Sequence, residues 1–248
     1  MTENSVCMAT YNGTQYLSEQ VASILAQLGV DDELVVVDDA SSDGTVALLE
    51  SMSDPRIRLV QNPQNLGVNS TFERAISLAQ GKVIFLSDQD DIWRPGRLAQ
   101  MRAALVDADA GLVVSNYGLI DQDGAALDQH LMTPLRASDG PRRAANFLGI
   151  LAGKRNYYGC AMCFTAAFAQ RALPFPKPME CHDLWLAICA NADGALVHLE
   201  QDTLAHRVHG SNASIISRSV MAKLNARLEL LALIWKASYK RVILSADQ

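Results

Sequence analysis

The stretch FLSDQDDIWRPGRL, residues 85–98, leads from an apolar run into a crowded acidic turn. Residues 83–86 are all apolar, which predicts a buried strand. Three carboxylates follow it within four positions, at Asp88, Asp90 and Asp91. Like charges this close repel by roughly 1 kcal/mol per pair even in bulk water. The stretch therefore predicts a cation or a charged ligand at the end of this strand.

The chain around this stretch alternates short apolar runs with helical periodicity. Strands are expected over residues 5–9, 34–37, 57–60, 83–86 and 112–115, and helices over 14–28, 42–52, 69–79 and 95–108, with Ser42 as an N-cap. This order predicts an α/β fold with a mostly parallel sheet flanked by helices. Ligands bind beyond the carboxyl ends of such strands. The polar clusters at 10–13, 38–39 and 88–91 are therefore expected on one rim.

The second half of the chain is less regular. A loop is expected over 121–140, helices over 142–151 and 182–192, and strands over 157–165 and 195–199. A final helix from residue 218 onward places Leu224, Leu228, Leu231 and Trp235 on one stripe. We expect this stripe to pack on the core, although a membrane surface or a dimer contact would explain it equally well.

Composition and charge narrow the class of protein. The 248 residues have a formal net charge of −6, which argues against binding nucleic acid through bulk electrostatics. The five cysteines are irregularly spaced, so no disulfide framework is expected. No secretion signal is evident, and no apolar run approaches the ~20 residues of a membrane span. We therefore expect a cytoplasmic protein, either free or peripheral at the inner face of the membrane.

The acidic clusters each allow a chemical and a structural interpretation. Mg²⁺ or Mn²⁺ often binds through one or two carboxylates together with phosphate oxygens, as Asp88 and Asp90 would allow. An acidic turn that caps the next helix would explain the same residues. At the second strand, Asp39 could accept hydrogen bonds from a nucleobase or a ribose, while Ser42 and Asp43 cap the following helix.

Six motifs together resemble a known family. They are ATYNG (9–13), VVVDDASSDGT (35–45), NLGVNSTFERAI (65–76), LSDQDDIWRPGRL (86–98), HDLWLA (182–187) and HRVHGSN (206–212). In this order and spacing they resemble the GT-A fold glycosyltransferases of family two. The last two are similar to those of bacterial rhamnosyltransferase-type members. The resemblance covers residues 5–215.

The resemblance implies a reaction and an organisation of the chain. The reaction is inverting transfer of a sugar, L-rhamnose by subtype, from a UDP- or dTDP-sugar to a saccharide or lipid-linked acceptor in polysaccharide biosynthesis. The implied cofactor is Mg²⁺ or Mn²⁺, which would assist departure of the diphosphate. Residues 1–118 would form the nucleotide-sugar half, 119–217 the acceptor-side half of the same domain, and 218–248 a terminal helix. A homodimer would be compatible with that helix.

The resemblance also implies roles for individual residues. Asp183 would be the catalytic base that takes the proton of the acceptor hydroxyl. Asp39 would accept a hydrogen bond from N3–H of uracil or thymine. The remaining implied contacts are Thr10 and Tyr11 beside the base, Asp88 on the ribose or the metal, Asp90 and His209 on the metal, and Arg207 on the diphosphate. The family pattern differs at His206 and Val208, where an aromatic residue and Gln are usual.

Three other functions and a zinc site are alternatives to the glycosyltransferase interpretation. A sugar-1-phosphate nucleotidyltransferase usually has a Gly-rich basic loop, whereas residues 10–13 contain one glycine and no cation. A catalytically silent nucleotide-sugar binder and a receiver-like domain built on Asp38 and Asp39 are non-enzyme alternatives. Cys160 and Cys163, with Cys181 and His182, have zinc-like spacing. A buried strand there would point the two thiols to opposite faces, which disfavours zinc.

Overall fold

The computed structural model describes residues 2–129, 131–179, 181–210 and 220–246. Within these residues nine strands form one sheet, in the order β3-β2-β1-β4-β8-β6-β9-β5, with β7 paired to β6. The strands are β1 (Asn4–Thr10), β2 (Glu33–Asp38), β3 (Ile57–Gln61), β4 (Val83–Ser87), β5 (Ile92–Trp93), β6 (Leu112–Ile120), β7 (Ala126–Leu127), β8 (Met162–Thr165) and β9 (Leu196–Arg207). The expected α/β sheet flanked by helices is confirmed.

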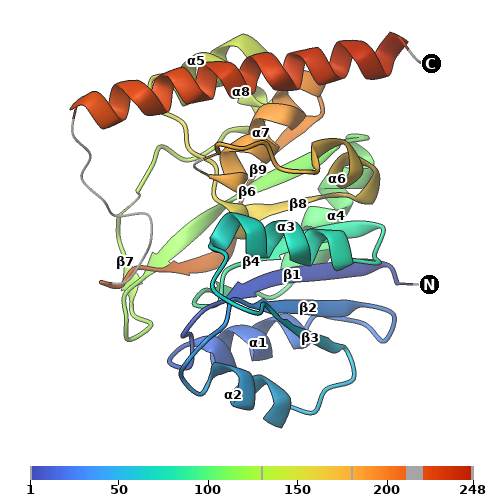
Figure 1. Ribbon diagram of the computed structural model, residues 1–248, viewed down its shortest axis with the longest axis vertical. Coiled ribbons are helices and arrows are strands. Elements are labelled where there is room, and N and C mark those ends of the chain that lie inside the picture. The colour runs from blue at the N-terminus through green and yellow to red at the C-terminus, as the bar shows by residue number, and fades with distance from the viewer. Residues whose placement is uncertain (1, 130, 180, 211–219, 247–248) are drawn as a thin grey trace.

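Helices cover both faces of this sheet (Figure 1). One apolar core lies under α1 (Leu17–Leu25), α2 (Thr45–Ser51) and α4 (Arg97–Asp107). The other lies under α3 (Val68–Leu78), α5 (Arg143–Leu151), α6 (Ala166–Ala172), α7 (His182–Asp193) and α8 (Val220–Ala246). Because both faces are buried, β1, β2 and β4 are nearly continuous apolar runs.

The sheet changes from parallel to mixed strand pairing across its width. Strands β3, β2, β1 and β4 are parallel neighbours, as the alternating first half of the sequence predicted. Strand β8 is antiparallel to both β4 and β6, and β6 then pairs in parallel with β9 across two irregularities in register. Strands β6 and β9 are longer than the sequence indicated, and β5, β7 and α6 were not predicted.

Two local predictions were wrong. Ser42 is not the N-cap of α2, because that helix begins after Gly44. Asp43 is the residue that satisfies the helix start, since its Oδ1 accepts the backbone N–H of Thr45 at 2.9 Å. The side of α8 that packs on the core is also opposite to the side that was predicted to pack.

Helix α8 lies across α5 and α7 (Figure 1). It buries Leu233 and Ala237, whereas the predicted contacts Leu231 and Trp235 are 50% and 66% exposed. The helix is apolar on more than one side, so periodicity could not identify the packed side. The side chain of Leu224 lies outside the described residues. Among the described residues, no helix is long and apolar enough to span a membrane.

Candidate active site

The carboxyl ends of three parallel strands bring the predicted polar clusters to one edge of the sheet. Thr10 at the end of β1 is in register with Asp38 at the end of β2, and its hydroxyl donates to Asp38 at 3.0 Å. Tyr11 follows on the surface, and its backbone N–H donates to Gln89 Oε1 at 2.9 Å. Gln89 lies between two carboxylates of the β4 end, so the first and fourth strands meet directly here.

Asp39 is buried and heavily hydrogen-bonded. Its Oδ1 accepts from Asn62 at 2.6 Å and from the backbone N–H of Leu66 at 2.8 Å, while Oδ2 accepts from the N–H of Gly67 at 2.9 Å. Burial alone would raise the pKa of this carboxyl, but these hydrogen bonds outweigh burial and hold the pKa below its usual value. Asp39 is thus an anion that fixes the loop before α3.

The acidic corner, defined as Asp88, Asp90 and Asp91, follows β4. One carboxylate oxygen from each lies within 4.8 Å of the others. Burial and the carboxylates of Asp91 and Asp90 raise the pKa of Asp88 to about 8. Burial and Asp91 also raise the pKa of Asp90. The three carboxylates therefore disfavour one another's charged forms, and a bound cation would relieve this repulsion.

The end of β9 and the residues directly after it supply the side chains that face this corner. His206 Nδ1 lies 2.8 Å from Asp91 Oδ1, and the backbone N–H of Arg207 donates to the same oxygen at 3.1 Å. Burial lowers the pKa of His206, but the Asp91 carboxylate outweighs burial and raises the pKa to about 9. His209 Nε2 lies 2.8 Å from Asp90 Oδ2.

Arg207 is only 2% exposed, and its guanidinium is engaged by the protein. Nε donates to the backbone carbonyl of Asp90 at 2.9 Å, and Nη2 pairs with Glu19 at 2.7 Å. The guanidinium carbon also lies 4.5 Å from the centre of the Tyr16 ring. A diphosphate contact from Arg207 stays a prediction, and it requires one of these contacts to be exchanged.

Asp183 lies in the first turn of α7 and faces the same region. Its Oδ1 accepts the thiol of Cys181 at 2.5 Å and the backbone N–H of Leu184 at 2.7 Å. Its Oδ2 accepts the N–H of Gly159 at 3.3 Å. Gly159 connects Asp183 to the end of β4, because a Cβ on this glycine would lie 3.6 Å from both Asp183 Cβ and Leu86 Cδ1.

The cysteines do not form the zinc site considered from their spacing. Cys160 belongs to the core on one face of the sheet and Cys163 to the core on the other, as expected for thiols on opposite faces. Cys160 instead lies beside Asp91 and His206, with its sulfur 3.9 Å from His206 Nδ1. The buried Asp91–His206 pair was not predicted, because its two members lie in distant segments of the chain.

Comparison with known proteins places this fold and site in a wider group. A family model described as Glycosyl transferase family 2 matches residues 5–171. The succinoglycan biosynthesis protein ExoO of Rhizobium meliloti (strain 1021) is 38% identical over 120 residues, covering 48% of this chain and 34% of that protein. The Escherichia coli protein named UDP-Glc:alpha-D-GlcNAc-diphosphoundecaprenol beta-1,3-glucosyltransferase WfgD is 31% identical over 119 residues, 48% of this chain and 47% of its own length.

A solved structure supports the fold. Residues 1–349 of S. aureus TarS, crystallised with UDP-GlcNAc, superpose with a TM-score of 0.71 at 17% identity. That superposition covers 95% of this chain and 66% of the other. This chain therefore spans between about a third and two thirds of the length of these three proteins.

Proposed function

We propose that this chain, which belongs to glycosyl transferase family 2, transfers a sugar from a nucleoside diphosphate sugar to an acceptor hydroxyl with inversion at the anomeric carbon. The observation that carries the proposal is that Asp183 and the acidic corner lie on either side of one short segment: Gly159 donates to Asp183, and the next residue, Cys160, lies beside Asp91. The acidic corner would face the leaving group, and Asp183 would face the acceptor. An in-line displacement requires groups on both sides of the reacting carbon in this way.

The acidic corner fits a hard divalent cation. It offers three carboxylates within 4.8 Å, and Asp91 Oδ2 is buried with no hydrogen-bond partner among the described residues. Asp90, assisted by Asp88 and His209, would hold Mg²⁺ or Mn²⁺. Such an ion, when bound, supplies positive charge to the departing diphosphate.

Asp183 is the proposed base. A carboxylate that accepts hydrogen bonds from Cys181, Leu184 and Gly159 is held in one orientation. It could take the proton of the acceptor hydroxyl as that oxygen attacks the anomeric carbon. The lack of a side chain at Gly159 leaves room beside Asp183, because a Cβ there would lie 3.0 Å from His182 Nε2 and 3.6 Å from Asp183 Cβ.

The nucleotide would lie on the edge formed by β1 and β2. Thr10, Tyr11 and Asp39 are the proposed base contacts, and Asp88 is the proposed ribose contact. A UDP-sugar donor is supported by the E. coli relative, which is named for UDP-Glc, and by the S. aureus structure, which contains UDP-GlcNAc. The dTDP-rhamnose alternative and the rhamnosyltransferase-like subtype rest on the motifs at 182–187 and 206–212 alone.

The organisation of the chain follows from this placement. Residues 1–118 would form the donor half, 119–217 the acceptor-side half, and 218–248 the terminal helix. The acceptor would be a saccharide or a lipid-linked saccharide in the biosynthesis of a polysaccharide. Peripheral membrane contact and a homodimer stay predictions.

Asp183→Asn provides the decisive test. The amide cannot accept the hydroxyl proton, so transfer to a panel of saccharide acceptors should fall at least a hundredfold. Binding of UDP in the presence of Mn²⁺, measured by calorimetry, should be unchanged, because Asp183 is on the acceptor side. Survival of transfer in this variant would show that another group is the base. Absence of metal-dependent UDP binding in the unaltered protein would contradict the proposed function itself.

A further inference from the structure

A cavity of about 340 Å³ lies on the acceptor-side half of the molecule, away from the acidic corner. It is bounded by the segment 133–142 on one side and by 154–156 on the other. Four cationic side chains line it, and we call them the cationic pocket: Arg136, Arg142, Lys154 and Arg155. Asp139 is the one acidic residue among the lining residues. This concentration of positive charge occurs in a chain whose formal net charge is −6.

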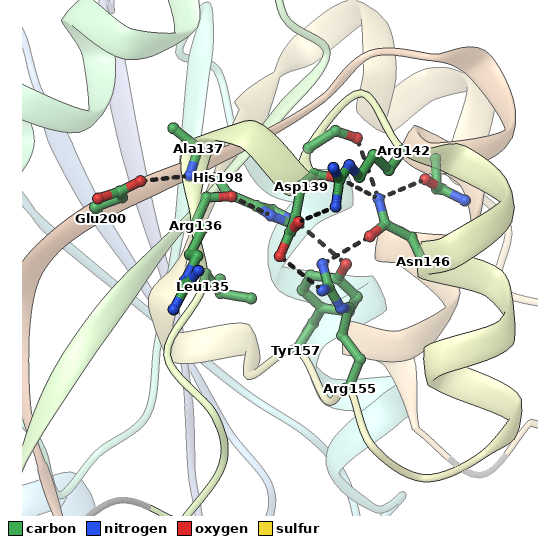
Figure 2. A network of polar contacts seen from close by, with 12 residues as sticks. Leu135, Arg136, Ala137, Asp139, Arg142, Asn146, Arg155, Tyr157, His198 and Glu200 are labelled. Atoms are coloured by element: carbon green, nitrogen blue, oxygen red, sulfur yellow. Dashed lines mark hydrogen bonds and ion pairs between the residues drawn. The ribbon is translucent and has the colours of Figure 1, made fainter.

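Asp139 is already neutralised by the pocket (Figure 2). Arg155 Nη2 lies 3.0 Å from Asp139 Oδ2, and Arg142 Nη1 lies 3.4 Å from Oδ1. The hydrogen bond and charge of Arg155 hold the pKa of Asp139 below its usual value, so the acid remains charged. Arg155 also donates to Asn146 Oδ1 at 2.7 Å, which fixes its guanidinium. With four cations and one anion, the lining carries a net charge of +3.

Two of the cations are left for a ligand. Among the described residues, the side chains of Arg136 and Lys154 make no hydrogen bond or ion pair, and both are exposed. The backbone of Arg136 is nevertheless anchored, because its carbonyl accepts from His198 Nδ1 at 3.2 Å and the next N–H, of Ala137, donates to Glu200 at 2.8 Å (Figure 2). The Arg136 side chain is therefore attached to a backbone position that hydrogen bonds hold in place in the pocket wall.

The cationic pocket is connected to the proposed base by a short run of residues. A smaller neighbouring cavity shares four lining residues with it: Thr133, Pro134, Leu135 and Asn156. Tyr158 lines that smaller cavity, and the next residue, Gly159, donates its N–H to Asp183. The smaller cavity measures about 30 Å³, roughly the space of one water, so it does not itself admit a sugar. An acceptor whose hydroxyl lies at Asp183 would reach the cationic pocket over the surface that the shared residues form.

We propose that the cationic pocket binds a phosphate group carried by the acceptor, an inference that rests on the proposed function and specifies its acceptor. A net charge of +3 exceeds what a single carboxylate would balance and suits a phosphate or diphosphate. Guanidinium groups match phosphate oxygens in bidentate geometry. The phosphate could belong to a diphosphate-linked lipid or to a phosphodiester polymer, and both present the same chemistry to the pocket.

The first experiment measures binding of inorganic pyrophosphate by calorimetry in EDTA. Without metal the acidic corner repels anions, so binding reports on the cationic pocket. The variant Arg136→Gln/Lys154→Gln should weaken pyrophosphate binding at least tenfold. The control Lys82→Gln/Arg102→Gln also removes two cations, both paired with Glu3, and Lys82 directly precedes the amino end of β4. It should leave binding unchanged. Equal affinity in the two variants, or no binding by the unaltered protein, would overturn the proposal.

Two further measurements separate the sources of phosphate and the two proposals. Displacement of pyrophosphate by farnesyl diphosphate in preference to glycerophosphoglycerol supports the lipid source, and the reverse order supports the polymer. Displacement by glucuronate alone contradicts a phosphate pocket. UDP binding with Mn²⁺ should be the same in all variants. Its absence from every protein, with pyrophosphate binding intact, would overturn the proposed function and leave the anion site standing.

Discussion

Among the groups that hydrogen-bond the proposed base, Asp183, the thiol of Cys181 lies closest to it. It donates to Asp183 Oδ1 at 2.5 Å from a position just before α7. Cys181 is therefore a positioning residue for Asp183, although its type suggested at first only a zinc ligand.

Replacing this donor should lower the rate of transfer without weakening donor binding. In Cys181→Ala the Asp183 carboxylate loses one of the three hydrogen bonds that orient it. For a bond worth about 1 kcal/mol, kcat should fall by about fivefold, while KM for the sugar nucleotide should stay the same. Cys181→Ser should restore kcat, because the hydroxyl also donates. An alanine variant with unchanged kcat would show that the thiol only fills space.

The sequence predicted the positions of individual residues where the signal lay in a single strand and the turn after it. Asp39, Asp88 and Asp90 follow apolar strands, and this pattern placed them on one edge of the sheet. Asp183 was assigned only through the family motif, because one carboxylate in a first helical turn is ordinary. The Asp91–His206 pair could not be foreseen, since its two members lie 115 positions apart. Pairings of this kind are decided by tertiary contact.

At the scale of elements, α8 offers a sharp comparison between two leucines on one helix. Leu233 is buried against the core, while Leu231 is half-exposed. Leu233→Ala removes buried methylene groups and should lower the free energy of unfolding by about 2–5 kcal/mol. Leu231→Ala should change it by less than about 1 kcal/mol. Urea denaturation of both variants checks this, and equal losses would mean that α8 does not pack through Leu233.

The elements themselves were predictable to different degrees. The parallel half was foreseen because each strand is a short apolar run and each helix has one apolar side. The ends of β6 and β9 were underestimated because their apolar patterns are interrupted, by the half-buried residues 116–118 in β6 and by the exposed polar residues 200–202 in β9. The packed side of α8 was misjudged for the opposite reason, since apolar residues occur all around it. Periodicity identifies a buried side only when the other side is polar.

At the scale of the whole molecule, the antiparallel strand β8 joins the two halves of the sheet. It pairs β4 with β6 and thereby places Gly159 and α7 beside the acidic corner. Nothing in the sequence predicted that strand order, because β8 is separated from β4 along the chain by α4, β6 and α5. The combined site therefore follows from topology, whereas its individual residues follow from local patterns.

The acidic corner should make the stability of the whole molecule depend on pH and on metal. The folded-state pKa of Asp88, about 8, lies above its ordinary 3.8, and that of His206, about 9, lies above 6.5. Both folded-state pKa values are raised, so their stabilising contributions are present at low pH and are lost as pH rises through these ranges. In EDTA, the melting temperature should therefore fall most steeply between pH 6.5 and about pH 8, where the titration ranges of the two groups overlap.

Divalent metal should reverse this trend. Mg²⁺ binds the deprotonated carboxylates, so the rise in melting temperature that it causes should be larger at high pH than at low pH. In Asp88→Asn one of the titrating groups is removed, so the fall in EDTA should be shallower. Asp90→Asn should lose most of the metal-induced rise, because Asp90 is the proposed principal ligand. Thermal denaturation followed by circular dichroism measures all three quantities. A metal-induced rise that is independent of pH would mean that the ion binds away from residues 88–91, and the proposed placement of the diphosphate would then have no support.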